Sequence, residues 1–199
     1  MKAGAIILAG GKSSRMGTNK ALLPLNEKMN IERIKDELQS VFDDIILVTN
    51  DPETYEFLNI RTVPDAYPGQ GPLAGLQAGL HASHYEENIV VACDMPFITA
   101  EIGMNIVKGL KHFDAVIPVI DEKQHPLFAA YQKRTAAVAK SCLEEGHLRM
   151  KDFLRNLDVF YLNEIALAAF GDVDTEKAFF NMNHPHEYDE AKKWTENRK

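Results

Sequence analysis

The sequence has little cysteine, no long apolar run and no acidic residue near its start. Its two cysteines, Cys93 and Cys142, have neither the spacing of a metal site nor the number that a disulfide framework needs, which indicates a reducing, cytoplasmic setting. The longest apolar runs are about six residues, far short of the roughly 20 that cross a bilayer, so no membrane span is expected. The apolar stretch after Lys2 is short and soon meets glycines, which is typical of a strand and not of a secretory leader.

Acidic side chains are missing before Glu27, although the 199-residue chain has 29 of them and a net charge of −7. The first 26 residues carry +4, so the remainder carries −11. A chain this acidic lacks the broad basic face that nonspecific nucleic-acid binding needs. A small positive segment in an acidic protein predicts one particular anionic ligand.

Short apolar runs alternate with helical patterns along the chain. Strands are expected at residues 3–8, 45–49, 61–64, 88–93, 114–119, 127–131 and 159–162, and helices at 30–42, from 72, 99–111, 133–145, 150–155 and from 185. This alternation predicts one α/β domain over residues 1–199, a three-layer Rossmann-like domain with a mostly parallel sheet. Asn30 is expected to cap the first helix. Ligands of such sheets bind beyond the carboxyl ends of the strands, which here means residues 10–20, Asn50, Asp65 and Asp94.

The first of these segments reads "LAGGKSSRMGTNKALLP" and does not fit either familiar phosphate motif. A P-loop ending at "GKS" would need glycine at position 6, which is Ile6, and the glycine spacing does not match G-x-G-x-x-G. Glycine still lets successive backbone N–H groups approach an anion closely. Arg15 and Lys20 would then supply side-chain charge for a triphosphate.

The segment resembles the signature L-A-G-G-x-S-x-R-M-G-x-x-K of bacterial nucleotidyltransferases of the molybdenum-cofactor branch, most closely its guanylyltransferases. "GPLAGL", "CDMPF", "HPLFAAY" and "NMNHPHEYDEA" follow in the order expected of that family and extend the resemblance over nearly the whole chain. The resemblance implies transfer of GMP from GTP to the phosphate of molybdopterin, with release of pyrophosphate and with Mg²⁺ as cofactor. It also implies other cofactor-biosynthesis proteins and recipient molybdoenzymes as partners. The chain departs from the family at "NEKMN", where G-K-P is common.

Carried onto this sequence, the resemblance implies three groups of site residues. The catalytic residues are Arg15, Lys20 and Asp94, with Asp94 also the Mg²⁺ ligand. The GTP site comprises Leu8, Ala9, Gly10, Lys20, Asp65 and Asp94. The pterin side comprises His125, Asn181 and Asn183, since amide side chains match the donors and acceptors of a pterin.

Each of these assignments has an ordinary structural alternative. Asp94 follows the apolar run "NIVVAC" at a strand end; the structural alternative is that it caps the next turn, but a hard oxygen ligand facing a cationic phosphate loop is better explained by Mg²⁺. Asp65 is either a nucleotide ligand or a turn carboxylate. The two asparagines before Pro185 suit helix capping as well as pterin binding. An acceptor phosphate is already ionised near neutral pH, so the reaction needs no general base, and no convincing base is seen.

Two other functions remain open from the sequence. One is a cytidylyltransferase acting on molybdopterin or on a sugar or polyol phosphate, although the family's cytidine members tend to read L-A-A-G where this chain reads "LAGG". The other is a carrier that delivers the cofactor without catalysis, which the intact set of Arg15, Lys20 and Asp94 argues against.

Overall fold

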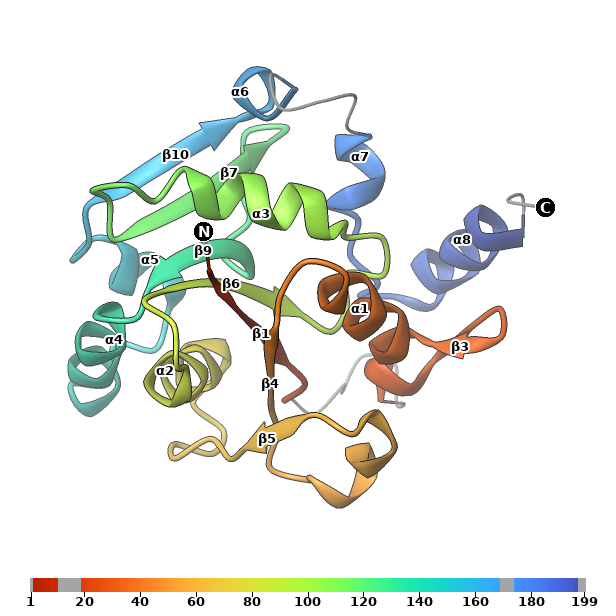
Figure 1. Cartoon of the computed structure of the whole chain (residues 1–199), viewed down its shortest axis with the longest axis horizontal. Coiled ribbons are helices and arrows are strands. Elements are labelled where there is room, and N and C mark those ends of the chain that lie inside the picture. Colours follow the sequence, from red (N-terminus) through yellow and green to blue (C-terminus); the bar gives the residue numbers. More distant parts are fainter. Residues whose placement is uncertain (1, 11–18, 169–173, 197–199) are drawn as a thin grey trace.

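The computed structural model describes residues 2–10, 19–168 and 174–196. Within these ranges an eight-stranded sheet runs in the order β10-β7-β9-β6-β1-β4-β5, with β8 paired to β7 (Figure 1). The strands are β1 (Gly4–Leu8), β4 (Asp44–Val48), β5 (Arg61–Val63), β6 (Glu87–Ala92), β7 (Ala115–Ile120), β8 (Lys123–Gln124), β9 (Phe128–Gln132) and β10 (Val159–Asn163).

The sheet is mostly parallel, as the sequence predicts. β1 pairs in parallel with β4 on one side and β6 on the other, and all five of its residues are buried. Within this sheet, as far as the structure describes it, only β9 and the two-residue β8 pair antiparallel with their neighbours. Residues 121–127, which join β7 to β9, are too few for the crossover that a parallel neighbour would need, so the chain doubles back.

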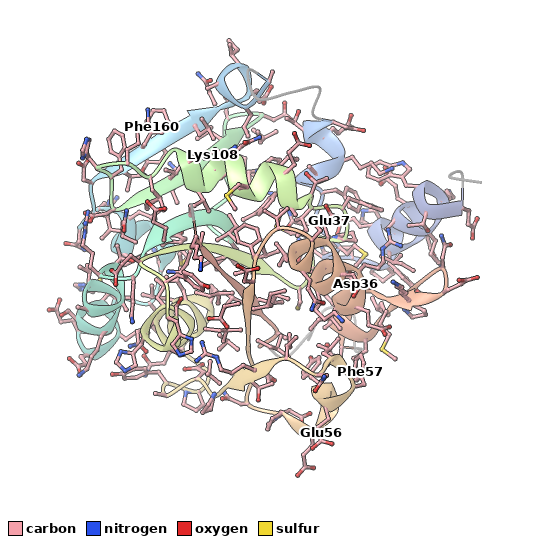
Figure 2. All side chains as sticks on the ribbon, in the orientation of Figure 1. Asp36, Glu37, Glu56, Phe57, Lys108 and Phe160 are labelled. Carbon is pink, nitrogen blue, oxygen red and sulfur yellow. The ribbon has the colours of Figure 1, made fainter. Side chains whose placement is uncertain are left out.

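Helices cover both faces of this sheet and make the three layers that the sequence predicts (Figure 1). On one face lie α1 (Asn30–Gln39) and α3 (Ala100–Lys108), and on the other α2 (Pro72–Ala82), α4 (Thr135–Glu144) and α5 (Met150–Leu154). Alternation along β1 divides the core, because Ala5 and Ile7 pack under α1 and α3 while Ile6 packs under α2. Glu37 of α1, labelled in Figure 2, accepts a hydrogen bond from the N–H of Ala100, and this bond joins α1 to the start of α3.

The close approach of α2 to the sheet depends on a glycine. A Cβ added at Gly79 would overlap the Ile6 side chain and lie 3.1 Å from Cγ2 of Val48. The corresponding atom at Gly75 would lie 3.5 Å from the Leu8 side chain, an ordinary contact distance. The packing of α2 on the sheet therefore requires a glycine at position 79, whereas a side-chain Cβ could be accommodated at Gly75.

The segment before α8 and α8 itself (Pro185–Glu196) pack against the early part of the chain. Their neighbour is a short hairpin of β2 (Pro24–Leu25) and β3 (Lys28–Met29), where Asn26 adopts the left-handed φ of 59° that asparagine tolerates. The Tyr188 hydroxyl donates to the Pro24 carbonyl at 2.7 Å. The remaining described helices are η1 (Lys20–Leu22), η2 (Glu53–Leu58), α6 (Glu164–Ala168) and α7 (Thr175–Ala178). None of the described helices is long and apolar enough to cross a membrane.

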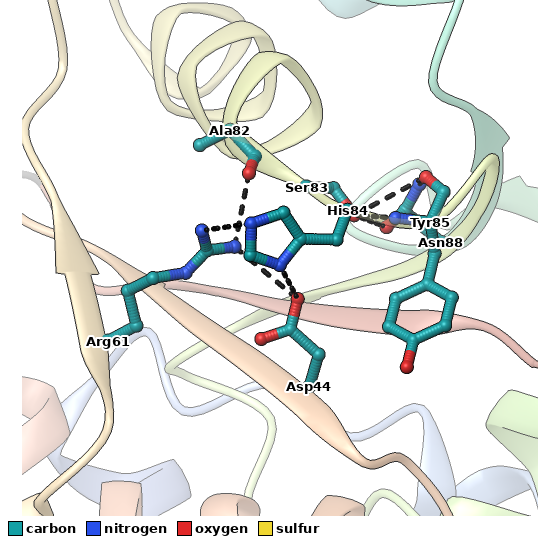
Figure 3. A network of polar contacts seen from close by, with 7 residues as sticks. All are labelled: Asp44, Arg61, Ala82, Ser83, His84, Tyr85 and Asn88. Carbon is teal, nitrogen blue, oxygen red and sulfur yellow. Dashed lines mark hydrogen bonds and ion pairs between the residues drawn. The ribbon is translucent and has the colours of Figure 1, made fainter.

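A polar network ties the amino ends of the strands together, at the edge opposite to the strand ends considered below (Figure 3). Arg61 of β5 donates to Oδ2 of Asp44 at 3.3 Å and to the Ala82 carbonyl at 3.0 Å, and Nδ1 of His84 lies 3.4 Å from the same Asp44 oxygen. Beside it, the fully buried Asn88 donates to the Tyr85 carbonyl at 2.9 Å. These contacts join β4, β5, α2 and β6 and account for the polar side chains here as structural.

Candidate active site

Four parallel strands end level with one another. Leu8 of β1 is in register with Val48 of β4 and with Ala92 of β6, and Val48 is in register with Val63 of β5. The residues that follow these strands therefore leave the same edge of the sheet. This edge brings together the described residues Gly10, Asn50, Asp65 and Asp94, which the sequence picks out as parts of a ligand site.

Lys20 extends from η1 to the end of β6. The side chain of Asn19 starts this turn by accepting from the Ala21 N–H at 3.1 Å. The Lys20 ammonium donates to Oδ1 of Asn183 at 2.8 Å and lies 4.0 Å from Oδ2 of Asp94. Only 14% of the Lys20 side chain is exposed, so its charge is directed into this edge and not into bulk water.

Asp94 has a carboxylate with unused bonding capacity. Its Oδ1 is buried and has no hydrogen-bond partner among the described residues. Burial raises the pKa of the Asp94 carboxyl above its ordinary value, and the Lys20 ammonium only partly opposes that shift. A desolvated carboxylate with a free oxygen suits a bound cation, since Mg²⁺ is commonly held by one or two carboxylates and substrate phosphates. Within the described part of the chain, no cluster of three or more His, Cys, Asp or Glu side chains that could hold a metal ion occurs.

The backbone around Asp94 is held from three directions. The Cys93 N–H donates to the Leu8 carbonyl at 3.1 Å, and the Asp94 carbonyl accepts from the Met182 N–H at 2.8 Å. The third contact comes from Asn30, whose Nδ2 donates to the Cys93 carbonyl at 2.6 Å.

The sequence interpretation of Asn30 as a helix cap is therefore wrong. Met29 is the N-cap residue of α1, and Glu32 accepts from its N–H at 2.8 Å. Asn30 is fully buried and shares one helical face with Ile34 and Leu38, at spacings of four residues. That spacing was the available signal that its side chain points inward.

The three predicted pterin residues have different surroundings. Asn183 contacts Lys20, and its backbone N–H donates to the Glu187 carboxylate. The Asn181 amide instead donates to the Phe179 carbonyl at 3.0 Å, within its own loop. His125 is 8% exposed, lies edge-on to the Phe179 ring, and has its pKa lowered to about 4, mainly by burial, so the ring is neutral near pH 7.

Asp65 ends β5 in a tight turn. One carboxylate oxygen accepts from the Tyr67 N–H at 2.6 Å, and the Asp65 N–H donates to Oδ1 of Asn50 at 2.8 Å. The turn-forming role suggested by the sequence is thus present, and it occupies one oxygen of the carboxylate. Asn50, which the sequence places at the edge without a role, links the ends of β4 and β5.

The end of β1 presents backbone groups at the same edge. Leu8 is buried, and the Ala9 N–H donates to the Val48 carbonyl at 3.0 Å. Gly10 is exposed, and a Cβ added there would meet no described atom within 4 Å. Arg15, the third predicted catalytic residue, lies outside the described residues together with the rest of segment 11–18.

Comparisons with known proteins show which family the chain resembles in sequence and fold. The family model described as "MobA-like NTP transferase domain" matches residues 5–160. A probable molybdenum cofactor guanylyltransferase from Pelotomaculum thermopropionicum is 36% identical, over 99% of this chain and 95% of the relative. A molybdenum cofactor guanylyltransferase from Desulfosudis oleivorans is 35% identical, over 94% of this chain and 92% of the relative.

Among solved structures, molybdopterin-guanine dinucleotide biosynthesis protein A from Archaeoglobus fulgidus is similar, with a TM-score of 0.84 and 27% identity over 98% of this chain and 99% of that one. The fold of the described residues and the sequence relatives agree. This chain belongs to the MobA-like NTP transferase family, within its group of molybdenum cofactor guanylyltransferases.

Proposed function

We propose that this protein transfers GMP from GTP to the phosphate of molybdopterin, releasing pyrophosphate and forming the guanine dinucleotide form of the cofactor. The observation that carries the proposal is the pairing of the Lys20 ammonium with the Asp94 carboxylate, 4.0 Å apart, at the carboxyl edge of the sheet. Relatives named for this activity, 36% and 35% identical, support it. We expect the reaction to take place in the cytoplasm, with other cofactor-biosynthesis proteins as partners, and its product to pass to molybdoenzymes.

The charge changes of the reaction fit this pair. A phosphate oxygen of molybdopterin attacks the α-phosphorus of GTP, the bond from that phosphorus to the bridging oxygen breaks, and pyrophosphate leaves. Negative charge builds on the equatorial oxygens and on the leaving group, and fixed cations stabilise it. Lys20 has three N–H donors, so it can keep its bond to Asn183 while donating to a phosphate oxygen. We expect Arg15 to add a guanidinium fork on the same phosphates.

Asp94 is the proposed ligand of Mg²⁺. Its buried oxygen without a hydrogen-bond partner among the described residues supports this role. When bound, Mg²⁺ would neutralise charge on the α-phosphate and on the pyrophosphate leaving group. The remaining ligands would come from the nucleotide and from water.

The two substrates would lie on either side of this pair. We assign the nucleotide to the ends of β1 and β5, with the backbone of Leu8, Ala9 and Gly10 against the guanine and the second carboxylate oxygen of Asp65 bonding base or ribose. We assign the pterin to the side of His125, Asn181 and Asn183. The neutral His125 ring offers one donor and one acceptor, as a pterin edge requires.

Pyrophosphate release tests the proposal. Purified protein with molybdopterin, GTP and Mg²⁺ should release one pyrophosphate for each molybdopterin converted, and neither substrate alone should suffice. Release with CTP at the rate seen with GTP would instead identify a cytidylyltransferase. Nucleotide and cofactor binding without any release would identify a carrier.

A further inference from the structure

Asn30 contacts the elements that carry both charged residues of the site. Its backbone N–H donates to the Leu23 carbonyl at 2.9 Å, and the Leu23 N–H in turn closes the η1 turn by donating to the Lys20 carbonyl. Its side-chain amide donates to the carbonyl of Cys93, the residue directly before Asp94. One buried residue thus joins the turn that carries Lys20 to the loop that carries Asp94.

We propose that Asn30 is a positioning residue that sets the separation between the Lys20 ammonium and the Asp94 carboxylate. This inference rests on the proposed function only in assigning nucleotide chemistry to that pair. The separation matters because the triphosphate and its cation must contact both groups at once. A displacement of about 1 Å in such a site can cost up to about 100-fold in rate.

An asparagine at position 30 suits this positioning role, and its burial would lower stability without a compensating role. A Leu side chain would fill a similar volume but has no donor for the Cys93 carbonyl, and Ser has a donor on too short a side chain. Burying the amide also leaves Asn30 Oδ1 without a hydrogen-bond partner among the described residues. A buried carbonyl without a partner is unfavourable for stability, so the amide is better explained by what its donor holds in place.

Two variants remove the link, and a third controls for the burial of an asparagine. Asn30→Leu and Asn30→Ser abolish the bond to Cys93 but keep the backbone bond to Leu23. Asn88→Leu makes the same change at the other end of β6, where an equally buried asparagine bonds the Tyr85 carbonyl in the structural network (Figure 3). All measurements are made well below the melting temperature of each variant, so that each is folded.

Three readouts separate positioning from folding. Asn30→Leu should lower kcat about 10- to 100-fold while the KM for GTP stays within about threefold. The affinity of the protein–GTP complex for Mn²⁺, followed by electron paramagnetic resonance without molybdopterin, should fall by at least about fivefold, because Asp94 is no longer held against the nucleotide. Asn30→Ser should behave in the same way. Asn88→Leu should lower the melting temperature but keep kcat and Mn²⁺ affinity within about twofold.

The inference is overturned if either Asn30 variant keeps both kcat and Mn²⁺ affinity within about threefold of the parent. The inference is also overturned if Asn88→Leu lowers kcat and Mn²⁺ affinity as much as the Asn30 variants do, since the loss would then follow from removing any buried asparagine. The Mn²⁺ measurement needs no acceptor. A parent protein that binds GTP and Mn²⁺ but transfers nothing to molybdopterin would contradict the proposed function and leave this test intact.

Discussion

Replacing Asp94 by asparagine should nearly abolish turnover without weakening the fold. The substitution keeps the shape of the side chain and removes the negative charge that faces Lys20 at 4.0 Å. It also replaces a carboxylate oxygen that is buried without a hydrogen-bond partner among the described residues. The proposed metal ligand is lost, while the backbone contacts of the Asp94 loop remain.

The effects on rate and on stability differ in size and in sign. Removing one positioned charge-stabilising group typically costs about 3–4 kcal/mol in the transition state, which is about a 10²- to 10³-fold loss of rate. For stability, two charges 4.0 Å apart attract by about 4 kcal/mol at an effective dielectric constant of about 20. Burial nevertheless raises the Asp94 pKa despite this attraction, so the surroundings disfavour the charged form. Neutral asparagine should therefore leave the free energy of unfolding near pH 7 unchanged or increased.

The sign of the pH dependence follows from the same shift. Because its folded pKa is raised, Asp94 stabilises the folded state when protonated, and this contribution is lost as the pH rises through the folded pKa. Asp94→Asn should remove that part of the pH dependence.

Pyrophosphate release and thermal unfolding at several pH values measure both effects. The matched control is Asp44→Asn, which breaks the ion pair with Arg61 at the opposite edge of the sheet and should lower the melting temperature with turnover retained. Turnover of Asp94→Asn within about threefold of the parent would refute the metal-ligand role. A loss of stability as large as that of Asp44→Asn would show that the carboxylate is structural.

Three further predictions concern other parts of the molecule. Lys20→Ala should reduce GTP binding and turnover much more than Lys12→Ala, because only Lys20 matches the fixed lysine of the motif; equal losses in a kinetic comparison would contradict the alignment. In the folded protein the pKa of His125 is lowered to about 4, against about 6.5 in the unfolded chain. The stability that neutral His125 contributes is therefore present above about pH 6.5 and should be lost as the pH falls toward about 4. His125→Gln should remove this pH dependence of the unfolding free energy in denaturant titrations. Gly79→Ala should lower the free energy of unfolding by about 1–3 kcal/mol because the new methyl group overpacks against Ile6. Gly75→Ala should lower it by less than about 1 kcal/mol, and equal losses would show that α2 shifts freely on the sheet.

The sequence predicts the sheet and its ligand edge because local chemistry determines them. Buried parallel strands are continuous apolar runs, and the residues that directly follow each run emerge at one edge of the sheet, which is where Asp94 lies after β6. Lys20 lies further along the chain from β1, and the structure places its ammonium 4.0 Å from the Asp94 carboxylate. The reversal of β9 depends on the short length of the connection from β7, a signal that is present in the sequence but weak.

The contacts across long stretches of chain could not be predicted in this way. The helical spacing of Asn30 from Ile34 and Leu38 indicates that its side chain points inward, but its partner, the Cys93 carbonyl, lies 63 residues away and has no local signal. The contact between Lys20 and Asn183 spans 163 residues and depends on the docking of the C-terminal segment against the β2–β3 hairpin. The local hydrophobic pattern predicts neither Cys93 as the partner of Asn30 nor Asn183 as the partner of Lys20. Tertiary packing selects these partners from among the side-chain directions that the local sequence permits.

The central claim is that this site transfers GMP from GTP to molybdopterin, and nucleotide competition in the transfer reaction tests it most directly. With molybdopterin and Mg²⁺ present, pyrophosphate release should favour GTP over CTP and ATP by roughly 100-fold or more, because a wrong base would leave buried polar groups unpaired. The product should carry one guanosine monophosphate for each molybdopterin. Equal use of CTP and GTP would contradict the assignment to guanine, and no release with any nucleotide would contradict the enzymatic activity itself.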